Sequence, residues 1–250
     1  MIVDNDNRLQ GMLYFEDVKN VKVLDNEFLQ SGEWTYNTQQ RALPTLRMAI
    51  GIENVWIARN YFHNNYGVPI SIGNELSQGS DCRYVFIKNN IMINNTLINP
   101  SGLEIAGITT NSVKDSEIAY NIIEKSVYGI SINGVNSRDI DIVHNRIDAG
   151  DTPITTDRGD GIVVWNEGIS NIKIAYNTLR NWLRNSIELG QAYLTYTADG
   201  VNHCFVHHNT IVKHSATTAY GIFIHGKYNW ITENYIYGTV DVEDIAEYMP

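Results

Sequence analysis

Short runs of alternating apolar and polar residues recur along the chain, and each ends at an asparagine. Typical copies are Ile-Ala-Arg-Asn60-Tyr-Phe, Ile-Ala-Tyr-Asn121-Ile-Ile and Ile-Thr-Glu-Asn234-Tyr-Ile. The apolar spacing of two before the asparagine predicts a β-strand, and the interruption there predicts a bend and a second strand. The copies are centred on Asn26, Asn60, Asn90, Asn121, Asn145, Asn177, Asn209 and Asn234.

A second motif, led in most copies by glycine, lies between the asparagines and predicts a third strand. Clear copies are Gly129-Ile-Ser-Ile, Gly161-Ile-Val-Val and Gly221-Ile-Phe-Ile, and we align Gly102-Leu-Glu104-Ile with them. Successive asparagines are 24 to 34 residues apart. The shortest intervals leave room for three short strands and their turns, so the longer ones must carry loops.

Three strands per repeat predict an all-β fold, a single-stranded right-handed parallel β-helix of about eight coils. A strand cannot pair with its own coil, so each coil stacks on the next at about 4.8 Å and like residues form columns. We expect an asparagine ladder at the bend, where asparagine tolerates a left-handed backbone and its amide bonds along the column. One domain is expected over residues 1–250, with coils over about 11–238.

Composition narrows the class of partner. The net charge is −10 and no basic run occurs, which argues against nucleic acid and against an anionic membrane. A neutral partner remains, or an anionic one held by a local arginine or a bound cation. No apolar run is long enough for a transmembrane helix, and the first residues do not form a signal peptide. Cys82 and Cys204 fall several coils apart, so we expect buried free thiols.

The repeat resembles the pectin-lyase-like superfamily of parallel β-helix proteins, over roughly residues 11–238. That superfamily includes polysaccharide lyases, glycoside hydrolases, uronan epimerases, phage tailspikes and inert modules. The resemblance implies a polysaccharide or oligosaccharide partner and an extracellular, cell-surface or virion location. It also directs attention to the outward face of the glycine-led strands, where many of its enzymes act. The signature residues of its polygalacturonases and mannuronan epimerases are missing here.

Two outward columns follow from the alignment of the glycine-led strands. The first is predicted to contain Arg47, Ser71, Glu104, Ser131, Val163, Glu188 and Phe223. The second is predicted to contain Ala49, Gly73, Ala106, Asn133, Trp165, Gly190 and His225. Two long insertions, 149–160 and 190–203, flank the later coils and are expected to wall a groove there.

Candidate catalytic residues are carboxylates and bases near these columns. Asp160 and Glu188 lie one coil apart, with about 11 Å expected between their Cα atoms, so long side chains could approach the spacing of a hydrolase pair. Arg158 and His225 are candidate bases for β-elimination, in which a cation or arginine neutralises the uronate. Asp157 with Asp160 forms a candidate calcium site. Each polar residue could equally be an ordinary solvated surface group.

Candidate substrate-binding residues combine an aromatic platform with polar groups, because sugar rings pair apolar faces with polar rims. They are Trp165, Tyr193, Arg184, Asn133 and Glu104. Trp165 facing outward would alternatively lie beneath a loop.

Several histidines lie near one predicted bend, and their positions indicate a surface role. His144 and His208 fall in one column with Tyr120 and Tyr176, just before the ladder asparagines. An outward polar stack is preferred over a zinc site formed by His203, His207 and His208.

Two hypotheses remain. The leading one is a polysaccharide-active enzyme, either a lyase or a hydrolase. The alternative is a non-catalytic carbohydrate-binding or structural module, such as part of a phage tail fibre or a surface protein. Because the repeat begins without a capping helix, we also expect further domains in a larger chain, or a homotrimer.

Overall fold

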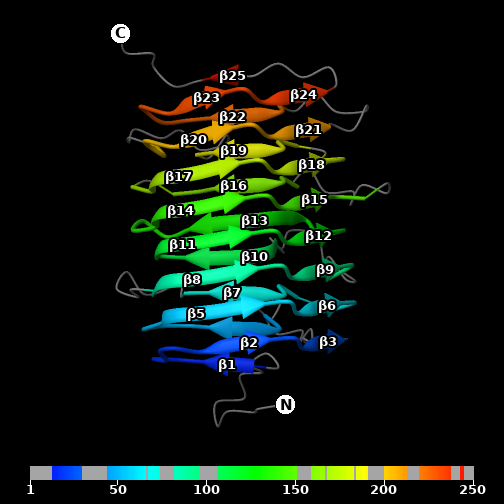
Figure 1. Ribbon diagram of the computed structural model, residues 1–250. Helices are drawn as coiled ribbons and strands as arrows, with labels where there is room; N and C mark the ends of the chain where they lie inside the picture. The colour runs from blue at the N-terminus through cyan, green and yellow to red at the C-terminus, as the bar shows by residue number, and fades with distance from the viewer. Residues whose placement is uncertain are drawn as a thin grey trace, which may run out of the picture.

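A computed structural model describes residues 13–29, 44–65, 67–73, 82–95, 106–150, 159–166, 168–182, 184–190, 200–212, 220–237 and 243–244. All regular structure among these residues is β-strand, arranged in three parallel sheets. In Figure 1 the coils rise from the N-terminal end to the C-terminal end, with the strands of the third sheet on the right. The expected parallel β-helix is confirmed.

The first sheet contains the glycine-led strands. Its strands are β1 (Leu13–Phe15), β4 (Leu46–Met48), β7 (Ile70–Ile72), β10 (Ala106–Asn111), β13 (Tyr128–Asn133), β16 (Ile162–Val164), β19 (Ile187–Leu189), β22 (Ile222–Ile224) and β25 (Glu243–Asp244).

The second sheet contains the strands before the ladder asparagines, and the third sheet contains the strands after them. The second is formed by β2 (Lys22–Leu24), β5 (Glu53–Ala58), β8 (Cys82–Lys88), β11 (Val113–Ala119), β14 (Arg138–Val143), β17 (Ser170–Ala175), β20 (Phe205–His207) and β23 (Trp230–Thr232). The third is formed by β3 (Glu27–Leu29), β6 (Tyr61–His63), β9 (Ile91–Ile93), β12 (Ile122–Glu124), β15 (Arg146–Asp148), β18 (Thr178–Arg180), β21 (Thr210–Val212) and β24 (Tyr235–Tyr237).

Eight coils of three strands are therefore present in the described residues, and we number them 1 to 8 from β1–β3 to β22–β24. The inward columns form one apolar core. Ile57, Ile87, Ile142 and Ile174, for example, are fully buried in the second sheet. Burial of this aliphatic surface from every coil is the main force that holds the stack together.

The asparagine ladder is confirmed atom by atom. In each step the backbone N–H and the side-chain Nδ2 of one asparagine donate to Oδ1 of the asparagine in the next coil. For Asn90 and Asn121 both bonds are 3.0 Å long. Nδ2 of Asn121 also donates to the carbonyl oxygen of Ile87 in the preceding coil, at 2.9 Å. A buried amide thus has its donors and acceptor satisfied, as burial requires.

The backbone of the bend differs from our expectation in one respect. The left-handed residue is the one before the ladder asparagine, and not the asparagine itself. These residues have φ between 54° and 58° and are Asp25, Arg59, Asn89, Tyr120, His144, Tyr176, His208 and Glu233. The asparagine is selected for its inward amide ladder, whereas its neighbour tolerates varied side chains because it points outward.

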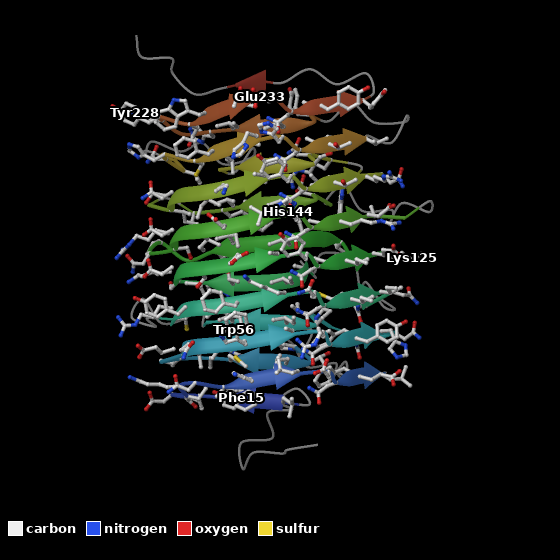
Figure 2. All side chains as sticks on the ribbon, viewed as in Figure 1. Phe15, Trp56, Lys125, His144, Tyr228 and Glu233 are labelled. Carbon is white, nitrogen blue, oxygen red and sulfur yellow. The ribbon has the colours of Figure 1, made fainter. Side chains whose placement is uncertain are left out.

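Those outward neighbours stack on one another in the later coils. The rings of Tyr120 and His144 lie 4.9 Å apart, those of His144 and Tyr176 5.0 Å apart, and those of Tyr176 and His208 4.9 Å apart. The predicted surface stack is therefore present. Figure 2 shows His144 on this bend and Trp56 on the adjoining second sheet.

Close packing explains why glycine precedes several of the first-sheet strands. A Cβ on Gly161 would lie 2.4 Å from Cδ2 of Leu179 and 2.5 Å from the carbonyl oxygen of Ser186. At Gly107, Gly129 and Gly161 the start of the strand is thus pressed against the third sheet of its own coil and the next coil's backbone.

Both cysteines are buried thiols outside any disulfide, as expected. Burial raises the pKa of the Cys204 thiol to about 12. No helical segment in the described part of the chain reaches the length and apolarity needed to cross a bilayer.

Candidate functional site

The outward face of the first sheet carries two columns of side chains. The register gives the first column as Tyr14, Arg47, Ser71, Thr109, Ser131, Val163, Glu188 and Phe223. One position corrects the sequence alignment. Thr109 pairs with Ser71 and Ser131, so the glycine-led strand of coil 4 begins at Gly107 and not at Gly102.

The misalignment has a physical cause. Thr110 occupies the inward position after Thr109 and is only 2% exposed, so a polar residue interrupts the apolar pattern of the true strand. Gly102-Leu-Glu104-Ile fits the pattern better, but the strand that pairs with β7 and β13 is Ala106–Asn111. The second column is corrected in the same way: its coil 4 residue is Asn111, which pairs with Asn133, and not Ala106. Glu104 itself lies outside the described residues.

Coils 2–5 present a polar and accessible half of this face. Arg47, Ser71, Thr109 and Asn133 are half-buried, one on each successive coil. Nδ2 of Asn133 donates to Oγ of Ser131 at 2.8 Å, which orients the amide. Hydroxyl and amide groups at fixed positions on rigid strands can bind a ligand without first becoming ordered.

Coils 6–8 present a closed half. Val163 and Glu188 are fully buried although they point away from the core, and Trp165 is 8% exposed. Trp165 packs edge to face on Tyr128, with ring centroids 5.2 Å apart, in a small outer apolar cluster with Val163. Trp165 is therefore not an open aromatic platform in this structure.

The predicted carboxylates come together in a buried ion cluster. Nη1 of Arg184 lies 3.4 Å from Oδ2 of Asp160, and its Nη2 lies 2.9 Å from Oε2 of Glu188. Nδ2 of Asn185 donates to the same Glu188 oxygen at 2.7 Å, and the Asn185 backbone N–H donates to Oδ1 of Asp160 at 2.6 Å. Asp160 and Glu188 are 0% exposed.

This geometry shows what the cluster can and cannot do as it stands. One guanidinium joins acidic groups of coils 6 and 7, which links the two coils electrostatically. A hydrolytic pair needs room for substrate and water between its carboxyl groups. Here the guanidinium of Arg184 occupies that space. The sequence predicted Asp160, Glu188 and Arg184 as candidate site residues, but it did not show that Arg184 lies between the two carboxyl groups. Asn185 was missed, because an asparagine before a strand gives no distinctive signal.

The remaining candidates divide into two groups. His225 follows β22 and is half-buried at the end of the second column, beside the backbone of Gly190. Asp157, Arg158 and Tyr193 lie outside the described residues, as does the calcium site that would include Asp157. Over the described ranges, no group of three or more His, Cys, Asp or Glu side chains is arranged to hold a metal ion.

Arg47 differs from most other described arginines. Its Nε atom is buried and has no hydrogen-bond partner among the described residues, and its guanidinium takes part in no ion pair there. The arginines that do face carboxylates are Arg59, Arg83, Arg138, Arg146 and Arg184.

Comparison with known proteins supports the fold. No family model and no curated protein matches the sequence. A variant of the periplasmic alginate epimerase AlgG superposes with a TM-score of 0.57 at 17% identity, over 80% of this chain and 43% of that one. A variant tailspike protein of E. coli bacteriophage HK620, in complex with a pentasaccharide, gives 0.54 at 12% identity, over 92% and 48%.

These likenesses are at the level of fold. They confirm the parallel β-helix expected from the resemblance to the pectin-lyase-like superfamily. The chain spans less than half the length of either protein. One is an alginate epimerase and the other holds a pentasaccharide, so this chain is structurally similar to polysaccharide-active β-helix proteins.

Proposed function

We propose that this chain binds a polysaccharide along the outward face of the first sheet, across coils 2–5. The observation that carries the proposal is the run of half-buried polar side chains on consecutive coils, from Arg47 through Ser71 and Thr109 to Asn133. Strand spacing places Arg47, Ser71 and Thr109 about 4.8 Å apart, and Asn133 lies one coil further on and two residues along its strand from the partner of Thr109. That spacing is of the same order as one sugar unit, so an extended glycan could meet a polar group on each coil.

The chemistry of the face suits a sugar chain. Hydroxyl and amide groups both donate and accept hydrogen bonds, which matches the hydroxyl rim of a pyranose ring. The similarity to an alginate epimerase and to a tailspike holding a pentasaccharide supports the same class of ligand. A secreted, cell-surface or virion location would suit this role.

A blocking substitution tests the proposal. Thr109→Tyr places a ring in the middle of the run, and Thr178→Tyr makes the same change at a half-buried outward threonine of β18 in the third sheet. Binding to a panel of acidic and neutral polysaccharides is measured by calorimetry. Loss of binding in Thr109→Tyr alone supports the proposal, whereas equal loss in both variants, or no binding by the wild type, contradicts it.

Catalysis, by a lyase or a hydrolase, is the second candidate function. The observation that favours it is the convergence of Asp160, Arg184 and Glu188 on the same face, one and two coils beyond Asn133. In this structure the cluster is buried, so catalysis would require it to become accessible to substrate. Arg158 and His225 remain the candidate bases for β-elimination, with Asp157 and Asp160 as candidate calcium ligands.

Product formation decides the matter. The protein is incubated with uronans and neutral glycans, while new reducing ends and the ultraviolet absorbance of unsaturated products are followed. Loss of product in Glu188→Gln and Asp160→Asn variants that still melt cooperatively supports catalysis by the cluster. Product that persists in both variants excludes these carboxylates.

A further inference from the structure

We infer that the polysaccharide bound by this face is anionic, and that Arg47 binds its charged group. This inference rests on the proposed function and adds to it the class of ligand and the residue that selects it. The charged group is a sugar carboxylate or a sulfate ester, because both offer oxygen pairs to a guanidinium.

The first step is the burial and hydrogen bonding of the Arg47 side chain. It points outward from β4, between Tyr14 of β1 and Ser71 of β7. The residue is half-buried, and its Nε is shielded from solvent without a hydrogen-bond acceptor among the described residues. A desolvated N–H without an acceptor is costly, and more so on a charged group. A ligand oxygen at this position would remove that cost.

The second step is the distribution of charge around Arg47. The protein has a net charge of −10, yet the described first-sheet strands of coils 2–5 contain no carboxylate. The described acidic residues of these coils all lie on strands of the second and third sheets: Glu53, Asp115, Glu117, Glu124, Asp139, Asp141 and Asp148. Arg47 is the one charged residue on the first-sheet strands of these coils as described.

The neighbouring coil does not neutralise this cation. Glu16 follows β1 in coil 1, and its Oε2 accepts a hydrogen bond from the Tyr14 hydroxyl at 3.0 Å. No ion pair joins Glu16 to Arg47 in the described structure. On the second and third sheets of these coils the carboxylates are accompanied by basic residues, and Arg83, Lys88 and Arg146 each lie in an ion pair with one of them. On the described first-sheet strands of coils 2–5, an anionic chain would therefore meet the Arg47 cation with no carboxylate on the same strands.

The third step is the chemistry of recognition. A guanidinium offers parallel N–H donors that match a carboxylate or sulfate with two hydrogen bonds, which a lysine ammonium cannot reproduce. Ser71, Thr109 and Asn133 on the following coils are uncharged. The face therefore fits a chain with a charged group at coil 2 and hydroxyl groups across coils 3–5.

A matched pair of polymers tests this inference. A uronan is compared with its carboxyl-reduced form, in which each uronate becomes a neutral sugar while the linkages stay the same. A sulfated neutral glycan and its desulfated parent form a second pair, which distinguishes the two sources of charge. We expect the charged member of one pair to bind about tenfold or more tightly than its neutral counterpart.

Variants assign the effect to Arg47. Arg47→Gln is expected to weaken binding of the charged polymer about tenfold and to leave the neutral polymer unchanged. Arg47→Lys should recover only part of the loss, because the charge remains but the paired donors do not. Arg146→Gln removes an arginine from the outward face of the third sheet, where it faces Glu124, and should have no effect on binding.

The outcomes separate the inference from the proposed function. If charged and neutral polymers bind equally, Arg47→Gln leaves binding unchanged and Thr109→Tyr abolishes it, the inference is overturned and the proposed function stands. No binding to any polymer overturns both. A charge preference that Arg146→Gln abolishes and Arg47→Gln does not would also refute the role of Arg47.

Discussion

Nη2 of Arg184 lies 2.9 Å from Oε2 of Glu188, four residues along the chain, and both side chains are buried. The same guanidinium reaches Asp160 in the preceding coil. A buried charge of this kind is tolerated only with its partners in place. The first role that the structure gives Arg184 is therefore structural: it joins coils 6 and 7 through its two ion pairs.

Removing this link should cost stability. Arg184→Ala leaves two buried carboxyl groups without their guanidinium, so we expect a loss of about 3 kcal/mol in the free energy of unfolding. Urea denaturation followed by circular dichroism measures it. The control is Arg146→Ala, whose exposed pair with Glu124 is worth at most about 0.5 kcal/mol. Equal effects of the two substitutions would contradict the assigned role of the cluster.

The interior of the asparagine ladder should matter more than its end. Asn121→Ala removes the acceptor of the Asn90 backbone N–H and leaves that buried donor unpaired, so a loss of about 2 kcal/mol is expected. Asn26→Ala, at the more exposed first coil, removes the Nδ2 donor to Asn60 but keeps the backbone N–H donor, and should cost about 1 kcal/mol or less. Thermal and urea unfolding of both variants test the ranking, which an equal loss would refute.

Close packing at the start of β16 predicts a sharp contrast between two glycines. In Gly161→Ala the new methyl group would meet Leu179 and the Ser186 backbone below 3.0 Å, which should destabilise the fold by about 2 kcal/mol. In Gly159→Ala the nearest atom is the Val127 carbonyl oxygen at 3.2 Å, so a small change is expected. Melting temperatures of the pair provide the measurement, and a tolerated Gly161→Ala would disprove the packing argument.

The contact between His207 and His208 should make stability depend on pH. Their Nδ1 atoms lie 2.9 Å apart, so one ring must donate and the other must accept. Partial burial lowers the pKa of His207 below its ordinary value of 6.5, and the nearby His208 and Lys173 lower it further. Because the folded-state pKa is lowered, the unfolded state binds more protons below pH 6.5. Stability should therefore fall as the pH drops from about 7 toward the lowered pKa.

Unfolding of the wild type and of His207→Gln, measured between pH 7.5 and 5, tests this dependence. We expect the difference in unfolding free energy between the two proteins to change with pH, in favour of the variant at the acidic end. A constant difference across the range would show that His207 does not contribute.

Much of the fold could be predicted from the sequence, and the reason is local. An apolar spacing of two, followed by an asparagine once per coil, specifies strand, bend and column without reference to distant residues. Ile57, Ile87 and Asn121 were therefore placed correctly. Thr109 was not, because the inward Thr110 interrupts the apolar pattern that the alignment relies on. The left-handed bend residue was missed by one position, because its side chain varies from coil to coil.

The sequence by itself determined the parallel β-helix, its eight asparagine-marked coils and, apart from coil 4, which first-sheet side chains point outward. Only the tertiary structure decided which outward side chains reach solvent. Glu188 and Trp165 point away from the core and are nevertheless buried, whereas Thr109 and Asn133 on the same face stay accessible. The physical reason is that the period of a strand fixes the direction of a side chain, while its burial depends on contacts between residues far apart in the chain. Those contacts also placed Arg184 between two acids and left Arg47 with none among the described residues.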